Sequence, residues 1–237
     1  EEQYQQYSAE PLKLNFHVSD HKDGVAVYFR DYLRRYMMAK KPERSDYPSW
    51  NMVRYHIDSI NWETDPLYGW CNKNRKRNGD NYNVYTDGLK VYTTIDSRMQ
   101  EYAEQAVREH IVKYLQPAFD KENRGRKSAP YSGKLSAEQV NNILMRSVRQ
   151  SERYRIMKEA GASEEEIKRS FNTKTDMSVF TYHGEVDTIM TPLDSIKYYK
   201  SFLRTGFVSM CPQNGHVKAY VGGLNWEHFA YDMVMEG

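Results

Sequence analysis

The strongest local signal in this chain is a β-hairpin in the stretch GFVSMCPQNGHVKAYVGG, residues 206–223. Two runs that alternate between apolar and polar residues flank Pro212 to Gly215. Asn214-Gly215 favours the tight turns whose twist matches that of antiparallel strands. A two-stranded hairpin is marginal in water by itself, so it must pair with or pack on a larger element.

Helical periodicity recurs along the rest of the chain. Residues 24–40 place Ala26, Phe29, Leu33, Tyr36 and Met37 on one face of an amphipathic helix. From 41 to 87 the chain is rich in Pro, Asn, Asp and Gly, which predicts an irregular surface connection with one short helix near residues 50–60.

A strand that leads directly into a helix is predicted in GLKVYTTIDSRMQEYAEQAVREHIVKYL. Val91 to Ile95 suit a strand, Ser97 with Gln100 has the form of a capping box, and Pro117 marks the helix end. The predicted buried stripe comprises Met99, Ala103, Ala106, Val107, His110, Ile111 and Tyr114.

Start and stop signals define further elements beyond a loop at 120–134, DKENRGRKSAPYSGK. Ser136 with Gln139 forms a second capping-box pattern, Gly161 ends that helical region, and Ser163 opens a short helix. MSVFTYHGEVDTIM predicts a hairpin about His183 and Gly184. TPLDSIKYYKSFLRTG predicts one more helix, with a proline in its first turn.

These elements predict an α+β fold. We expect a small mixed domain of helices with short antiparallel strands and hairpins. With 39% hydrophobic and 28% charged residues, the composition is that of a soluble globular protein.

The sequence offers no convincing metal, cofactor or catalytic site. Cys71 and Cys211 have no metal-ligand spacing, and two free, partly buried thiols are favoured over a disulfide. His17 and His21 are four residues apart, but their segment is extended and then turn-like, so no metal site is predicted.

Other chemically interesting residues are interpreted as structural. We expect turn and cap roles for the carboxylates Asp58, Asp65 and Asp87. We expect helix packing for Tyr198, Tyr199 and Phe202. Gly222 and Gly223 are expected to form a tight bend rather than a phosphate loop.

Two stretches together resemble the class A, bifunctional penicillin-binding proteins. GLKVYTTIDSRMQEYAEQAV looks like the segment that introduces their transpeptidase domain, and GFVSMCPQNGHVKAYVGGLNWEHFAYDMVMEG is similar to the opening hairpin of that domain. PLKLNFHVSDHKDGVAVYFRDYLRRYM resembles the exit from their glycosyltransferase domain. Cys211 departs from the family pattern, which usually has Asp before the proline.

The resemblance implies four regions. Residues 1–45 would be the C-terminal tail of the glycosyltransferase region, and 46–87 a linker. Residues 88–175 would form a strand plus a helical inter-domain segment, and 176–237 a hairpin, a helix and the first strands of an incomplete transpeptidase domain. The implied function is a non-catalytic segment that positions the two catalytic domains of a peptidoglycan synthase.

The resemblance also implies partners and a location. The partners would be the neighbouring catalytic domains and, in addition, cell-wall regulatory proteins, on the periplasmic side of the inner membrane. The sequence contains no run of about 18 apolar residues, which is the length that spans a bilayer. The N-terminal helix that anchors such proteins would therefore lie outside this sequence.

Neither catalytic motif set of the family is found. The transpeptidase set is S-x-x-K, S-x-N and K-T-G, and the S-x-x-K would follow shortly after Gly237. Loose matches occur at Ser19 to Lys22, at Ser59 to Asn61 and at Arg204 to Gly206. Their polar-turn and helix-end settings do not suit acyl transfer.

The alternative is a binding module that uses basic loops. The clusters Asn72 to Arg77 and Asn123 to Lys127, with nearby Tyr68, Trp70 and Tyr82, could contact nucleic acid or anionic lipid. The net charge of +2 argues against a continuous basic face. Solvated loops are the favoured interpretation, and no nucleic-acid partner is expected.

Overall fold

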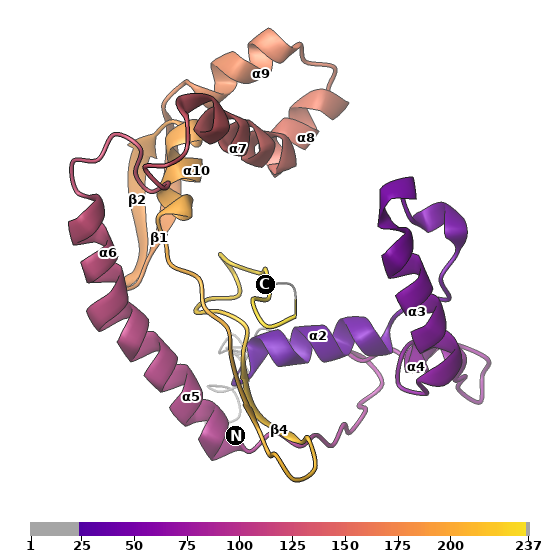
Figure 1. Cartoon of the computed structure of the whole chain (residues 1–237). Helices are drawn as coiled ribbons and strands as arrows, with labels where there is room; N and C mark the ends of the chain where they lie inside the picture. Colours follow the sequence, from indigo (N-terminus) through magenta and orange to yellow (C-terminus); the bar gives the residue numbers. More distant parts are fainter. Residues whose placement is uncertain (1–23, 236–237) are drawn as a thin grey trace, which may run out of the picture. The chain divides into compact units, whose positions relative to one another are not determined.

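The computed structural model describes residues 24–235, and the chain divides into two compact units, 1–93 and 94–237 (Figure 1). Each unit is described by itself. The interpretations of His17, of His21 and of Ser19 to Lys22 lie outside the described residues.

The first unit is helical. It contains α2 (Val27–Met37), two 3₁₀ turns (Arg44–Asp46 and Ser49–Asn51), α3 (Met52–Thr64) and α4 (Trp70–Lys73). The helix predicted within 24–40 is confirmed, although two of its buried residues, Tyr28 and Asp31, were absent from the predicted face. Asp31 is buried because Arg34 and Arg35 both pair with it.

The region 41–87 contains more helix than the sequence suggests. Helix α3 is 13 residues long and buries Asp58. Arg54 pairs with Asp58 at 3.1 Å, and the hydroxyl of Tyr47 donates to the same carboxylate at 2.9 Å. These polar contacts replace part of the apolar packing that a helix of this length would otherwise need.

The second unit is mixed, as predicted by the α+β assignment. Helices α5 (Ser97–His110) and α6 (Gln116–Asn123) are joined by a π-helical turn, Ile111–Leu115. After a loop come α7 (Ala137–Gln150), α8 (Glu152–Glu159) and α9 (Glu164–Phe171). The unit continues with β1 (Thr175–Thr181), β2 (Gly184–Met190), α10 (Pro192–Lys200), β3 (Phe207–Met210) and β4 (Val217–Val221).

The strand predicted at Val91 to Ile95 is wrong. No strand forms there, and the side chain of Tyr92 is 91% exposed. The chain instead touches β4 just afterwards, where the hydroxyl of Thr94 donates to Val217 O and the amide of Asp96 donates to Lys218 O. Two bonds at the end of an extended segment do not make a ladder.

Three predictions about the following helix were also wrong: its N-cap, its end and its buried stripe. Asp96, not Ser97, is the N-cap, and its carboxylate accepts from the amides of Arg98 and Met99. Pro117 lies inside the helix, because the preceding π-helical turn redirects the backbone bonding. Of the predicted stripe only Ala103 and Ile111 are buried; Met99, Ala106, His110 and Tyr114 are exposed.

The caps of α7 and α9 are confirmed. Ser136 and Gln139 form a reciprocal capping box, and Ser163 caps α9 with help from Glu166. Gly161 has a φ of 81°, which is the left-handed conformation expected after a helix end.

A compact apolar cluster joins α7, α9 and α10. Val148, Ile167 and Phe171 are each at most 7% exposed. The half-buried side chains around them are Met145, Tyr154, Met157, Ala162, Leu193 and Ile196. We call this set the α7–α10 core.

Both predicted hairpins are confirmed as antiparallel pairs. Strands β1 and β2 pair from Thr175 opposite Met190 to Thr181 opposite Gly184. Strands β3 and β4 form the second pair, with an irregularity between Ser209 and Met210. A smaller core of Ala103, Ala219 and Val221 packs α5 against β4.

Candidate functional site

The most constrained polar contacts of the second unit lie along the helical run α5–α6. Gln100 is fully buried, and its amide exchanges two hydrogen bonds with the backbone of Tyr220. Its Nε2 donates to Tyr220 O at 2.8 Å, and its Oε1 accepts from Tyr220 N at 2.7 Å. The side chain therefore bonds to β4 as a neighbouring strand would.

A second buried glutamine makes a similar connection farther along. The Oε1 of Gln116 accepts from the amide of Leu203 at 2.9 Å and from the hydroxyl of Tyr182 at 3.1 Å. Its Nε2 donates to Ser201 O at 3.0 Å and to Asp120 at 2.9 Å. Gln116 thus holds the end of α10 and the tip of the β1–β2 hairpin to the helix.

The two contacts are 16 positions apart, or roughly 24 Å along a helix. One end of the run α5–α6 is fixed to β4, and the other end to the hairpin and α10. Helix, strand pair and hairpin are therefore tied to one another by satisfied, buried hydrogen bonds. We call this arrangement the glutamine joint. The sequence gives no separate signal for it, since both residues also suit an exposed helix face.

Aromatic side chains fill the space beside the joint. Phe180 contacts Phe229 edge to face, with ring centroids 5.2 Å apart, and contacts Phe202 at 5.4 Å. The guanidinium of Arg204 lies 3.6 Å from the ring centroid of Phe229. Tyr198, Tyr199 and Phe202, predicted to pack, are part of this cluster.

The segment after β4 is also tied down. Asp232 is 2% exposed and accepts a hydrogen bond from the hydroxyl of Tyr220 at 2.6 Å. Its other oxygen accepts from the amide of Val234. Residues 224–235 are therefore held against β4 and the aromatic cluster.

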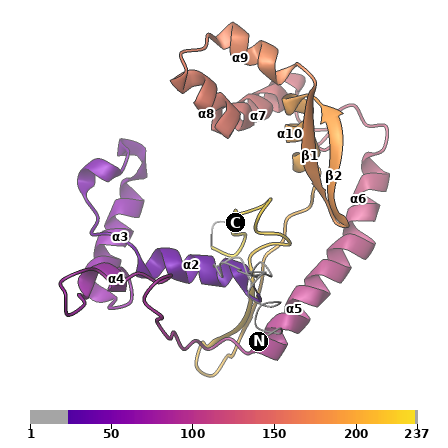
Figure 2. The same cartoon turned by 180° about the vertical axis from the view of Figure 1, so that it is seen from behind.

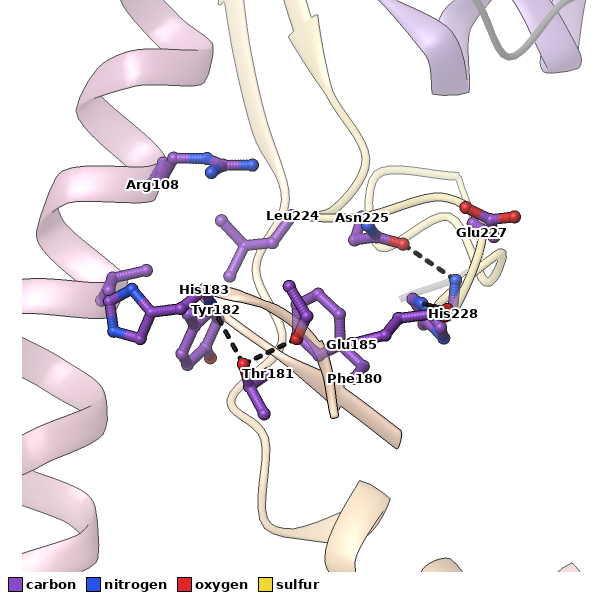
Figure 3. Close-up of a pocket in the computed structure, with 12 residues that line it drawn as sticks. Arg108, Phe180, Thr181, Tyr182, His183, Glu185, Leu224, Asn225, Glu227 and His228 are labelled. Atoms are coloured by element: carbon purple, nitrogen blue, oxygen red, sulfur yellow. Dashed lines mark hydrogen bonds and ion pairs between the residues drawn. The ribbon is translucent and has the colours of Figure 1, made fainter. Parts of the chain in front are cut away.

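An open cleft of about 410 Å³ lies at the hairpin tip (Figure 3). It is lined by α5 through Arg108, by the hairpin through His183 and Glu185, and by the later segment through Glu227 and His228. His228 Nε2 lies 3.0 Å from Glu185 Oε1. Charges of both signs line the cleft.

Burial of the Tyr182 hydroxyl raises its pKa to about 12. A tyrosine that holds its proton more tightly in the folded state stabilises the fold below about pH 10 and loses that contribution as the pH rises toward 12. We expect wild-type stability to fall across this window and Tyr182→Phe to lose less across it, as measured by urea unfolding at stepped pH.

The matched control is Tyr102→Phe, which alters a side chain that is 68% exposed on α5. Its alkaline profile should equal that of the wild type. A Tyr182→Phe profile with the wild-type slope between pH 10 and 12 would contradict the assignment.

Two of the loose transpeptidase-like matches make contacts within their own units. The hydroxyl of Ser59 donates to Tyr55 O within α3, and Arg204 stacks on Phe229 in an extended segment after α10. Within residues 24–235 no group of three or more His, Cys, Asp or Glu could hold a metal ion. The thiol of Cys71 is buried and that of Cys211 is half-buried.

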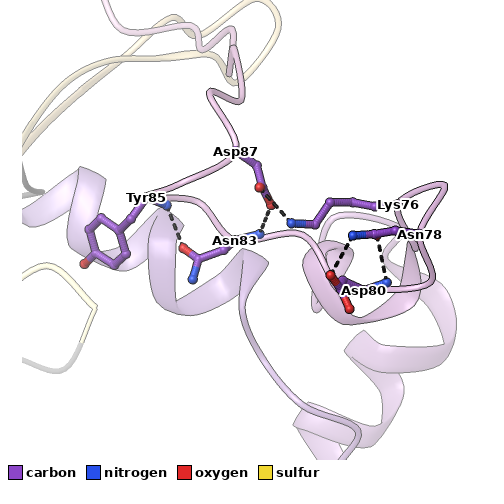
Figure 4. Close-up of polar contacts among 6 residues, drawn as sticks. All are labelled: Lys76, Asn78, Asp80, Asn83, Tyr85 and Asp87. Atoms are coloured by element: carbon purple, nitrogen blue, oxygen red, sulfur yellow. Dashed lines mark hydrogen bonds and ion pairs between the residues drawn. The ribbon is translucent and has the colours of Figure 1, made fainter.

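Both basic loops make hydrogen bonds within themselves, and Figure 4 shows those of the first loop. Lys76 pairs with Asp87 at 2.8 Å, and Asp87 also accepts from the amide of Asn83. Arg126 donates to Asn123 and to Tyr131 O in the second loop. Asp87 therefore has the predicted turn role, and each loop uses part of its positive charge internally.

The other two carboxylates differ from one another. Asp65 accepts from the amide of Leu67 at the end of α3, a cap role, and the hydrogen bond from Tyr36 lowers the pKa of its carboxyl group. Asp58, by contrast, is a buried partner of Arg54 inside α3. The turn-and-cap prediction is therefore wrong for Asp58 alone, because a buried carboxylate paired with an exposed arginine was not foreseen.

Comparison with known proteins gives one match. Residues 126–203 match the family model described as the penicillin-binding protein middle domain. No curated protein and no solved structure matches the chain. Among the described residues, no helix is both long and apolar enough to cross a membrane.

The matched range contains the α7–α10 core and the β1–β2 hairpin. This range lies between the two stretches, 88–107 and 206–237, on which the resemblance to penicillin-binding proteins was based. Residues 126–203 of this chain are therefore similar to the penicillin-binding protein middle domain.

Proposed function

We propose that this chain is a non-catalytic connecting region of a bifunctional peptidoglycan synthase. Its role is to fix the distance and orientation between the glycan-polymerising and the peptide-cross-linking domains. The parent protein would be of class A, anchored by one N-terminal helix and working on the periplasmic side of the inner membrane. Its neighbours along the chain, and cell-wall regulatory proteins, are the partners that such a role requires.

The glutamine joint is the observation that carries this proposal. Gln116 lies outside the middle domain, yet three of its bonded residues, Tyr182, Ser201 and Leu203, lie inside it. Gln100, on the same helical run, bonds to β4. A rigid helix with one satisfied polar contact at each end transmits position more faithfully than a flexible linker.

The isolated chain gives the first test. It should neither polymerise a lipid-linked glycan precursor nor form a stable covalent adduct with labelled penicillin. Detection of an adduct on any serine of this chain, Ser19 included, would contradict a non-catalytic role.

The parent enzyme gives the second test. Gln116→Leu removes the contact to the hairpin and α10, so the cross-linked fraction of the product should fall while glycan polymerisation continues. Changes at such connecting residues alter coupling by about 0.5–2 kcal/mol, or roughly 2- to 30-fold. The readouts are muropeptide cross-linking per disaccharide polymerised and the rate of penicillin acylation.

Gln105→Leu is the matched control, because Gln105 is exposed on the same helical run and bonds only weakly to Glu109, at 3.5 Å. It should leave both activities unchanged. Equal cross-linking by Gln116→Leu and wild type would contradict a positioning role for the joint.

A further inference from the structure

The two edges of the β1–β2 hairpin differ in whether their outward backbone groups are hydrogen-bonded. Thr181 and Gly184 pair across a two-residue turn, so backbone bonding alternates and the N–H and C=O of Phe180 point away from β2. These outward groups are satisfied, since Phe180 N–H donates to the Tyr199 hydroxyl at 3.0 Å and Phe180 O accepts from the Tyr198 hydroxyl at 2.6 Å. Helix α10 therefore closes the β1 edge there.

The β2 edge is open. By the same alternation, the outward N–H and C=O groups on β2 belong to Glu185, Asp187 and Ile189. No residue in the described range 24–235 forms a backbone hydrogen bond with them. The side chains of Val186 and Ile189 are 51% and 65% exposed. Figures 1 and 2 both show β1 between α10 and β2.

The exposed edge carries negative charge on one face. Glu185 and Asp187 project to the same side of the pair as Asp176, which lies opposite Ile189 on β1. All three residues are exposed. Among the ion pairs of the described residues, His228 pairs with Glu185, at the end of the edge next to the cleft.

We propose that the β2 edge binds an extended, basic segment of a partner protein by adding it as a third strand. Main-chain bonds to Glu185, Asp187 and Ile189 hold the segment, and side chains set its specificity. Residues opposite Glu185 and Asp187 lie on the acidic face and are Lys or Arg, two positions apart. Residues between them lie beside Val186 and Thr188 and are apolar or β-branched.

A second copy of this chain is a poorer occupant. Antiparallel pairing of two β2 edges centred on Asp187 places that carboxylate opposite itself, and like charges directly opposite destabilise a strand pair. The charge of the edge therefore selects a basic partner over self-association. This inference goes beyond the positioning role and does not depend on it.

The test uses the 237-residue chain and a synthetic peptide, SVTKVKTG, acetylated and amidated at its ends. In antiparallel register its two lysines lie opposite Asp187 and Glu185, and its first valine lies opposite Ile189. At about ten times Kd, the exchange of the outward amides of Glu185, Asp187 and Ile189 should slow about tenfold, as followed by NMR. The control peptide carries Glu in place of both Lys and should bind far more weakly.

Asp187→Pro is the deciding variant. It removes an outward N–H and leaves the β1–β2 ladder bonds of Val186 and Thr188 in place, as proline on an edge strand allows. Peptide binding should be lost while those ladder amides stay protected. If that variant disturbs the hairpin, Asp187→Asn serves instead and should weaken binding and reduce its salt dependence.

Three results would overturn the proposal. These are binding that Asp187→Pro leaves intact, equal binding of the lysine and glutamate peptides, or protection of amides elsewhere than on β2. Self-association of the chain through β2, seen by sedimentation and abolished by Asp187→Pro, would replace the basic partner with a second copy.

Discussion

Replacing Gln100 with leucine should lower the free energy of unfolding of the 94–237 unit by roughly 3 kcal/mol. The substitution leaves the buried N–H and C=O of Tyr220 without their partners, and each unsatisfied group costs about 1–3 kcal/mol. Leucine has a similar volume, so the loss is chiefly one of hydrogen bonding. The effect should concentrate on β4 and its attachment to α5.

Hydrogen exchange of the Tyr220 amide is the measurement for this variant, because it reports the local opening of β4. A loss of about 3 kcal/mol corresponds to an exchange rate more than a hundredfold faster. Gln105→Leu on the exposed face of α5 is the control and should change the Tyr220 rate little. Unchanged exchange in Gln100→Leu would show that β4 is held by other contacts.

Replacing Ile167 with alanine should destabilise the α7–α10 core by about 2–5 kcal/mol. Ile167 is 2% exposed and packs with Val148 and Phe171, so truncation removes buried methyl groups and leaves a cavity. The comparison is Ile156→Ala on α8, where the side chain is 53% exposed. That change should cost less than about 1 kcal/mol.

Thermal and urea unfolding, followed by circular dichroism and by exchange of α7 and α9 amides, measure the difference between the two variants. Loss of protection in α7 and α9 for Ile167→Ala alone is the expected result. Similar losses in both variants would mean that burial at Ile167 does not control this core.

The sequence predicts best those elements whose causes are local. The caps at Ser136 and Ser163 and the β1–β2 hairpin depend on residues a few positions apart, and the structure contains all three, with the hairpin turn at Tyr182-His183. Such features are decided by hydrogen bonds and turn geometry within one short segment.

The capping-box prediction for Gln100 was wrong because the partner of its side chain is distant in the sequence. Its spacing from Ser97 fits a capping box, but its amide bonds to Tyr220, 120 positions later in the chain. No local pattern reveals a partner so distant. The strand predicted at Val91 to Ile95 failed similarly, because β-branched residues favour strands only where a neighbouring strand supplies a ladder.

The candidate site was predictable only in outline. The resemblance indicated a penicillin-binding protein, and the middle-domain match lies between two of the stretches that carried it. The sequence did not reveal that two buried amides would join the helix to β4 and to the hairpin. Polar residues on a helix are read as exposed unless a long-range contact is known.

The π-helical turn at Ile111–Leu115 determines the direction in which Gln116 points. In an uninterrupted α-helix, residues 100 and 116 would lie about 160° apart around the axis, on nearly opposite sides. The amide of Gln116 instead bonds to Ile111 O, one residue farther back than in an α-helix, and this extra residue reduces the angle to about 60°. Removal of one residue between 112 and 115 would relax the π-helical turn to an α-helix and leave Gln116 facing Tyr182 and Leu203, because 15 α-helical positions also give about 60°.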